Sequence, residues 1–266
     1  MSDYALTLSD AEIRRYQHMA ASAHRAEADL WAAAGIVDGA VVADVGCGPG
    51  AIATLMARLV GDRGHVWALD QNEGALSAAD ALSTSLGIGN LSIRPGDATA
   101  TGLDPASVDV VVMRHVLAHN GGREQAIVDH LASLVKPGGS VYLVDTDVTA
   151  VRIPSAPDGL ADLTDCYVRF QTARGNDLCV GLRLAGLLAA AGLEVVEYRG
   201  RFDIIPAQPG FRPPAWAARD LMVEAGIATA ADVERWGAAF ERLDQGEPPG
   251  VTTFVPVFSA IGRRPA

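Results

Sequence analysis

Short apolar strands alternate with amphipathic helices through the first half of the chain. Five segments have the length and apolar content of strands: 41–45, 65–70, 91–94, 108–113 and 140–145. Between them, apolar residues recur at three- and four-residue steps, as a buried helix face requires. A strand, a helix and a second strand in this order form a right-handed parallel unit. The alternation therefore predicts an α/β fold with a parallel, doubly wound sheet.

A long helix is expected ahead of the first strand. Ser9 and Glu12 have the spacing of a capping box, and Gly35 supplies a left-handed C-cap. We expect residues 1–35 to form an N-terminal helical lid. Its apolar stripe is predicted to contain Ile13, Tyr16, Ala20, Ala23, Ala26, Leu30 and Ala34.

The strand–helix rhythm changes after Asp147. Residues 36–266 are expected to form one domain with two cap insertions, at 152–180 and at 206–250, the second of which holds six prolines. Outside the five strands we expect a turn at 136–139, helices near 160–171 and 181–191, and strands at 193–198 and 251–261.

The most informative segment is residues 44–50 (DVGCGPG), which runs from the first strand into a helix. Glycines there let the backbone turn tightly and approach a ligand that a β-carbon would exclude. Asp70 ends the next strand, where a carboxylate can accept hydrogen bonds from both hydroxyls of a ribose. Together these features predict a ligand that contains a nucleoside.

The glycine spacing separates two kinds of nucleoside ligand. A dinucleotide fingerprint is Gly-x-Gly-x-x-Gly, whereas Gly46, Gly48 and Gly50 alternate with single residues. Asp44 would repel a pyrophosphate, but it suits the ammonium of an amino acid. This pattern favours S-adenosylmethionine, and it disfavours a nicotinamide oxidoreductase.

Further motifs follow the loop in a fixed order: Asp70, residues 96–98 (GDA), Arg114-x-x-Leu117-x-His119, and residues 134–139 (LVKPGG). This series resembles the class I S-adenosylmethionine-dependent methyltransferases, in the subgroup with ubiquinone-, menaquinone- and natural-product-type enzymes. The resemblance covers much of residues 36–145. It implies a Rossmann-like, mostly parallel seven-stranded sheet with helices on both faces.

The resemblance implies a role for each half of the cofactor site. On the methionine side, Gly46 and Gly48 would lie against the ligand, Asp44 would contribute to the ammonium environment, and Arg114 would line the site through its backbone.

On the adenosine side, Asp70 would hold the ribose, with Gln71 beside it near the adenine. Asp97 would accept a hydrogen bond from the adenine amino group, and the backbone of Ala98 would meet the ring.

Catalytic candidates stand at the ends of the fourth and fifth strands. His115 and Asp147 are candidate bases, needed only where the acceptor atom carries a proton; packing and a solvated loop are the alternative roles. Tyr16, Tyr167 and Arg169 are candidates for lining an acceptor pocket, although each is also explained as a half-buried aromatic or a surface arginine.

Composition and missing motifs narrow the acceptor. A net charge of −11 argues against nucleic acid as partner. No Asn/Asp-Pro-Pro-Tyr motif follows the fourth strand, and no acidic cluster there suits Mg²⁺, so we expect no metal. We find neither a secretory signal nor an apolar run of about 20 residues, and we expect a cytoplasmic monomer or homodimer without membrane contact.

We therefore expect methyl transfer to carbon or oxygen of a small-molecule acceptor, such as a secondary metabolite or a quinone-like compound. The alternative is an S-adenosylmethionine-binding protein that catalyses another reaction or acts as a binding module. Methylation of RNA or protein remains a further alternative.

Overall fold

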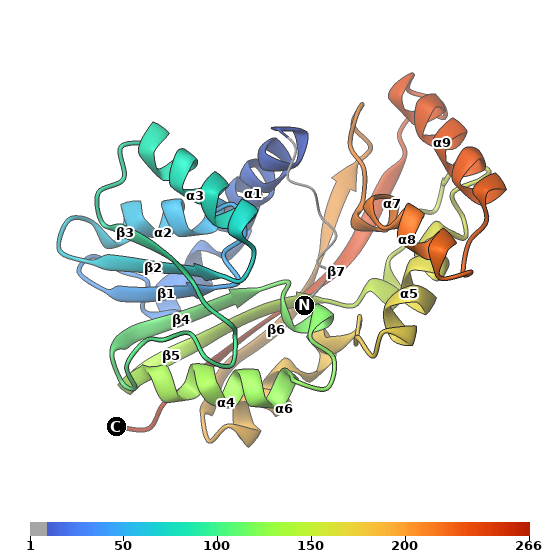
Figure 1. The fold of residues 1–266 in the computed structure, drawn as a ribbon. Coiled ribbons are helices and arrows are strands. Elements are labelled where there is room, and N and C mark those ends of the chain that lie inside the picture. Colours follow the sequence, from blue (N-terminus) through green and yellow to red (C-terminus); the bar gives the residue numbers. More distant parts are fainter. Residues whose placement is uncertain (1–9) are drawn as a thin grey trace.

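The computed structural model describes the backbone of residues 10–266 and the side chains of residues 17, 18 and 20–266. One seven-stranded sheet with the order β3-β2-β1-β4-β5-β7-β6 runs through it (Figure 1). Strands β1 to β5 are parallel, and β7 is antiparallel to both of its neighbours. The strands are β1 Val41–Val45, β2 His65–Asp70, β3 Leu91–Pro95, β4 Val108–Arg114, β5 Val135–Thr146, β6 Glu194–Pro206 and β7 Thr252–Arg263. The predicted mostly parallel α/β sheet is confirmed.

Each face of the sheet has its own apolar core. The face covered by α1 (Asp10–Ala34) and α2 (Ala51–Val60) buries Leu30, Met56 and Tyr142. The opposite face buries the apolar sides of α4 (Glu124–Leu134) and α6 (Leu184–Ala190), which lie along the lower side of Figure 1. Helix α3 (Glu73–Ser85) follows β2 and contacts α2.

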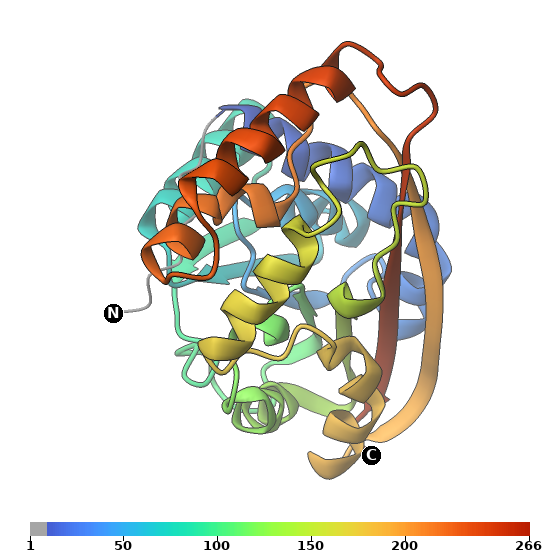
Figure 2. The ribbon, with the colours of Figure 1, turned by 90° about the vertical axis from the view of Figure 1, so that its right-hand side faces the viewer.

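The remaining helices form a cap. They are α5 (Leu163–Ala173), α7 (Pro214–Ala217), α8 (Arg219–Glu224) and α9 (Ala230–Asp244). Helix α5 contacts α7 and α8, so two segments far apart in sequence pack together beyond the carboxyl ends of the parallel strands (Figures 1 and 2). The division into a lid, a domain and two insertions stays a prediction.

Several predicted boundaries in the second half were wrong. Strand β5 begins at Val135 rather than at 140, because residues 136–139 bulge out of a continuous strand where the pairing shifts between Val108 and Val110. Strand β6 continues to Pro206, since β7 pairs with it along its whole length. The helix predicted at 181–191 begins as a 3-10 turn, Val180–Arg183, and becomes α6 only at Leu184.

The buried stripe of α1 also differs from the prediction. Ala26 is exposed, and Glu27 takes its place among the buried residues Ala23, Leu30 and Ala34. The capping residues Ser9 and Glu12, and the side chains of Ile13 and Tyr16, lie outside the described residues. A carboxylate on the core side of a helix needs partners, and these are found in the candidate site.

Candidate functional site

The loop after β1 is shaped by glycines in left-handed conformations. Gly46 has φ 78°, and a β-carbon there would lie 2.4 Å from a methyl carbon of Val116. Gly48 has φ 53°, but a β-carbon there would meet nothing within 4 Å. The N–H groups of Gly46 and Cys47 donate to the carbonyl of Leu69 at 2.7 and 3.0 Å. The loop is thus fixed against β2 and faces open space at Gly48.

Asp70, at the end of β2, takes part in shaping the loop. Its Oδ2 accepts from the N–H of Gly48 at 2.9 Å, and its Oδ1 accepts from the N–H of Asn72 at 2.9 Å. Each carboxylate oxygen can accept a further hydrogen bond. Gln71 is exposed beside it. The ribose role of Asp70 and the adenine-side role of Gln71 stay predictions.

Asp44 is a buried carboxylate with one unused oxygen. The residue is 2% exposed, and its Oδ2 has no hydrogen-bond partner among the described residues. Burial raises the pKa of Asp44 to about 7; the charge of Arg114 opposes this rise and that of Asp70 adds to it. A buried, unpartnered carboxylate oxygen is costly unless a ligand supplies a donor or a positive charge. The unpartnered carboxylate oxygen of Asp44 therefore fits an ammonium group.

Asp97 lies in the loop after β3 and is held ionised. It accepts from the N–H and hydroxyl of Thr99 at 2.8 and 2.6 Å, and from Nη2 of Arg123 at 2.6 Å. The Arg123 guanidinium, followed by the two Thr99 bonds, holds the pKa of Asp97 well below its usual range. An ionised carboxylate only accepts, which agrees with the predicted bond from an amino group. Ala98 is half-buried beside it, and its backbone role stays a prediction.

Arg114, at the end of β4, contributes more than the backbone assigned to it from the sequence. Its guanidinium pairs with Glu27, which is 0% exposed. The same carboxylate accepts from the hydroxyl of Tyr142 at 2.6 Å and from Nη2 of Arg201 at 2.7 Å. Sequence reasoning missed Glu27, although it stands four residues after Ala23 and three before Leu30, which is the spacing of the buried face of a helix.

His115 follows β4 in a strained conformation. Its φ is 54°, which is uncommon for a residue with a β-carbon, and its N–H donates to the carbonyl of Val144 at 2.8 Å. Burial, with the nearby Arg114 charge, lowers the pKa of His115 to about 3. The imidazole is therefore neutral at pH 7 and a weak base. Its catalytic role stays a prediction.

Other polar groups at the strand ends hold local turns. Asp145 accepts from the N–H groups of Thr146 and Ala118 at 2.9 and 3.2 Å, and burial raises its pKa to about 7. Asp147 accepts from the N–H of Thr149 at 2.9 Å and so caps a short 3-10 turn. This capping role is compatible with the predicted role of Asp147 as a catalytic base, and that role stays a prediction.

Of the three acceptor candidates, Tyr167 and Arg169 differ in burial. Tyr167 of α5 is buried. Arg169 follows two residues later in the same helix; it is exposed and donates to the Ile227 carbonyl at 3.4 Å. Residues two apart on a helix point in different directions. The Tyr16 side chain lies outside the described residues. Their substrate roles stay predictions.

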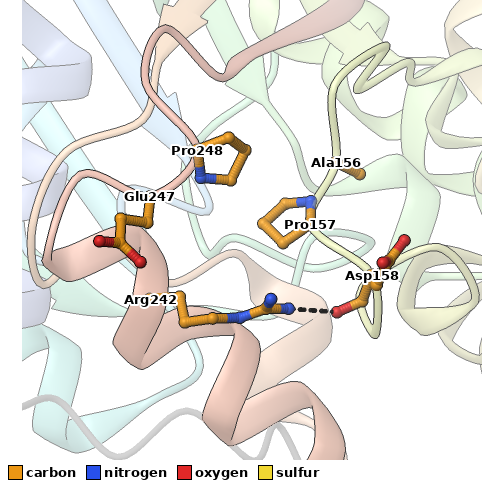
Figure 3. Close-up of a pocket in the computed structure, with 6 residues that line it drawn as sticks. All are labelled: Ala156, Pro157, Asp158, Arg242, Glu247 and Pro248. Atoms are coloured by element: carbon orange, nitrogen blue, oxygen red, sulfur yellow. Dashed lines mark hydrogen bonds between the residues drawn. The ribbon is translucent and has the colours of Figure 1, made fainter.

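A separate shallow cavity of about 360 Å³ opens at the rim of the cap (Figure 3). Residues 156–158 line one side, and Arg242 at the end of α9 donates to the carbonyl of Asp158 at 2.7 Å. Glu247 and Pro248 complete the lining. No residue of the glycine loop takes part, so this cavity is distinct from the cofactor site.

Two features are absent from the described part of the chain. No group of three or more His, Cys, Asp or Glu side chains is arranged to hold a metal ion. No helix there combines the length and apolar character needed to cross a membrane.

Comparisons with known proteins agree with this geometry. Residues 36–166 match a family model described as a methyltransferase domain. A ubiquinone biosynthesis O-methyltransferase of Cupriavidus pinatubonensis (strain JMP 134 / LMG 1197) is 32% identical over 167 residues, which span 61% of this chain and 63% of that relative. The chain thus matches less than two thirds of the relative's length.

Solved structures share the fold at low identity. A Bacillus halodurans C-125 crystal structure has a TM-score of 0.61 and 21% identity, covering 90% of this chain and 98% of that one. The structure named as the [4+2]-cyclase SpnF has a TM-score of 0.54 and 16% identity, covering 86% and 76%.

The sheet order, the glycine loop and the acidic residue that ends β2 define a class I, Rossmann-like methyltransferase fold. Residues 36–166 match the methyltransferase-domain family, and the chain is similar to class I S-adenosylmethionine-dependent methyltransferases.

Proposed function

We propose that the protein binds S-adenosylmethionine and transfers its methyl group to carbon or oxygen of a small-molecule acceptor. The observation that carries the proposal is the buried, unpartnered oxygen of Asp44 in β1, the strand that leads into the glycine loop. A carboxylate in that position suits the ammonium of an amino acid joined to a nucleoside. The similarity to a ubiquinone biosynthesis O-methyltransferase supports a small, ring-containing acceptor.

The residues around the loop would divide the ligand between them. Asp44 would face the ammonium, Asp70 the ribose hydroxyls, and Asp97 with the Ala98 backbone the adenine. Bound S-adenosylmethionine supplies an electrophilic methyl group on a sulfonium. The protein's task is then to align the acceptor with that carbon, and such positioning contributes several kcal/mol in well-oriented reactions.

His115, directly after β4, would be a candidate base. With a pKa of about 3 it is deprotonated at pH 7, but it takes a proton readily only as the acceptor becomes acidic. This favours acceptors that lose their proton easily, such as phenols and activated carbon acids, over simple alcohols.

A catalyst that binds S-adenosylmethionine without methyl transfer is the second candidate. The observation in its favour is the shared fold with a structure named as a cyclase. Incubation with methyl-labelled S-adenosylmethionine and a panel of phenols and quinols separates the two. Label in a product supports transfer, and binding without label across the panel favours the second candidate.

Isothermal titration calorimetry with S-adenosylhomocysteine tests the cofactor class, with NADH as the control ligand. We expect micromolar binding of S-adenosylhomocysteine and none of NADH, because the glycine spacing and Asp44 disfavour a pyrophosphate. Binding of NADH, or of neither compound, would contradict the proposed function.

A further inference from the structure

Five strands carry a row of side chains beneath α1. Asp44 of β1 is in register with Val112 of β4, and Val112 is in register with Tyr142 of β5. Paired residues in a sheet point to the same face, as do residues two apart on one strand. Arg114 therefore lies on the same face as Asp44 and Tyr142. The buried residues of this face pack against α1 and α2.

The row continues through β7 to the edge strand. Arg201 of β6 is in register with Val257, whose side chain belongs to the same core. Arg201 reaches Glu27 at 2.7 Å and Asp203 at 2.8 Å. Glu27 of α1 thus binds guanidinium groups from β4 and β6, two strands that do not pair with each other.

Arg114 lies on the strand next to Asp44 and on the same face of the sheet. Neighbouring strands lie about 4.8 Å apart and rise about 3.3 Å per residue, which places the two Cα atoms about 8 Å apart. The charge of Arg114 counts among the main influences on Asp44, on His115 and on Asp145. Its guanidinium is therefore the positive group on the methionine side of the glycine loop.

The burial of Glu27 is hard to explain by stability alone. Moving an ion pair out of water costs about as much as the pair returns, and apolar residues of similar volume often serve a core equally well. An ion pair buried here would fix the position of the Arg114 guanidinium beside the proposed cofactor site. Without Glu27, the Arg114 side chain would be free to fold back onto Asp44 and neutralise it.

Resting on the proposed function, we propose that Glu27 is a positioning residue. It holds the Arg114 guanidinium away from Asp44, so that the Asp44 carboxylate stays open for the amino-acid end of S-adenosylmethionine. Arg201 and Tyr142 hold Glu27 in turn, which links α1, β5 and β6 to the cofactor loop. The effect is local to the amino-acid end of the ligand.

A pair of ligands distinguishes positioning from general loss of structure. S-adenosylhomocysteine carries the amino-acid end, whereas 5′-methylthioadenosine has the same nucleoside and thioether without it. Measured by calorimetry, Glu27→Gln is expected to weaken the binding of S-adenosylhomocysteine at least about tenfold and the binding of 5′-methylthioadenosine less than about twofold. The expected difference is that of one charge-assisted contact, which is worth roughly 1.5–3 kcal/mol.

Two further variants complete the experiment. Glu124→Gln makes the same change in a buried carboxylate of α4, paired with Arg183 at 3.2 Å, and it should leave both affinities unchanged. Tyr142→Phe removes one hydrogen bond to Glu27 and keeps every charge. If Glu27→Gln does not fold, Tyr142→Phe decides, with an expected loss of about threefold for S-adenosylhomocysteine alone.

The outcomes separate this inference from the proposed function. Wild-type protein that binds neither nucleoside overturns both. Wild-type protein that binds both, with equal losses for the two ligands in the folded variant, overturns only the positioning role. Unchanged affinity for S-adenosylhomocysteine in the folded variant does the same.

Discussion

Asp44 and Glu27 are both buried carboxylates on the α1 side of the sheet, but their surroundings are opposite. Glu27 is surrounded by donors, and the charges and hydrogen bonds of Arg114, Tyr142 and Arg201 lower its pKa in spite of burial. Asp44 has an unpartnered oxygen, and burial raises its pKa to about 7. The hydrogen-bonding needs of Glu27 are met within the protein, whereas one oxygen of Asp44 has no partner among the described residues.

The raised pKa of Asp44 predicts a pH dependence of cofactor binding. In the free protein the carboxyl loses its proton near pH 7, whereas the ammonium of S-adenosylhomocysteine requires the ionised form. Affinity should therefore rise roughly tenfold from pH 6 to pH 8, as expected for one group titrating in that window. Calorimetry at pH 6, 7 and 8 measures this dependence.

Asp44→Asn is the matched variant for that titration. It keeps the shape of the side chain and removes the proton equilibrium, so its affinity should be lower at pH 8 and independent of pH. A flat profile in the wild type would show that Asp44 does not titrate with the ligand.

At the residue scale, the sequence nominates the acidic residues of the proposed site but not their partners in the structure. Asp44, Asp70 and Asp97 stand in local motifs that a single sequence displays. Arg123, just before α4, and Glu27 of α1 reach Asp97 and Arg114 across 26 and 87 residues of sequence. Such contacts depend on how elements pack, and that information is spread over the whole fold.

At the element scale, the cap depends on a contact between the start of α5 and the middle of α9. Asp162, just before α5, accepts from the indole N–H of Trp236 at 2.9 Å and pairs with Arg235 at 2.8 Å. Trp236 is 0% exposed, and its neighbour Phe240 packs edge-on against Trp216. One carboxylate therefore joins the two sequence segments of the cap.

Asp162→Ala is expected to destabilise the protein by about 1–3 kcal/mol, because it leaves the buried indole N–H without an acceptor. Urea unfolding followed by tryptophan fluorescence measures the change. Asp158→Ala is the control: Asp158 contributes its backbone carbonyl to Arg242, and the substitution keeps that carbonyl. Equal destabilisation by the two variants would contradict a specific role for the Asp162 side chain.

The elements with strong periodicity were predicted well, and those that depend on their neighbours were not. Strands β1, β2 and β4 lie at or within one residue of their expected bounds, since each is a short apolar run between polar turns. The strand predicted at 193–198 ends well before β6 does. Pairing with β7 extends it to Pro206, and no local pattern reveals that partner.

At the scale of the whole molecule, the proposed cofactor site joins the carboxyl ends of four strands. Asp44 lies one residue before the end of β1 and the glycines follow that strand, Asp70 ends β2, Asp97 follows β3, and Arg114 ends β4. A ligand that contacts all of them binds only the folded chain.

Saturating S-adenosylhomocysteine should accordingly raise the melting temperature. At a concentration 100 times Kd, binding adds about 2.7 kcal/mol, which corresponds to roughly 5–10 °C for a chain of this size. Differential scanning fluorimetry measures the shift, with NADH as the control. An equal shift with NADH, or none with S-adenosylhomocysteine, would contradict the assembled site.

The position of β7 between β5 and β6 has a consequence for synthesis of the chain. Strand β6 has no neighbour in the sheet except β7, which follows it by more than forty residues. Domains emerge from the ribosome amino end first. While β7 is still inside the ribosome, the sheet of strands β1 to β5 can form. Strand β6 then has no strand to pair with, and its Arg201 is not yet held in place to pair with Glu27. A nascent chain stalled before β7 should therefore expose β6 to proteases and chaperones, although its glycine loop is already complete.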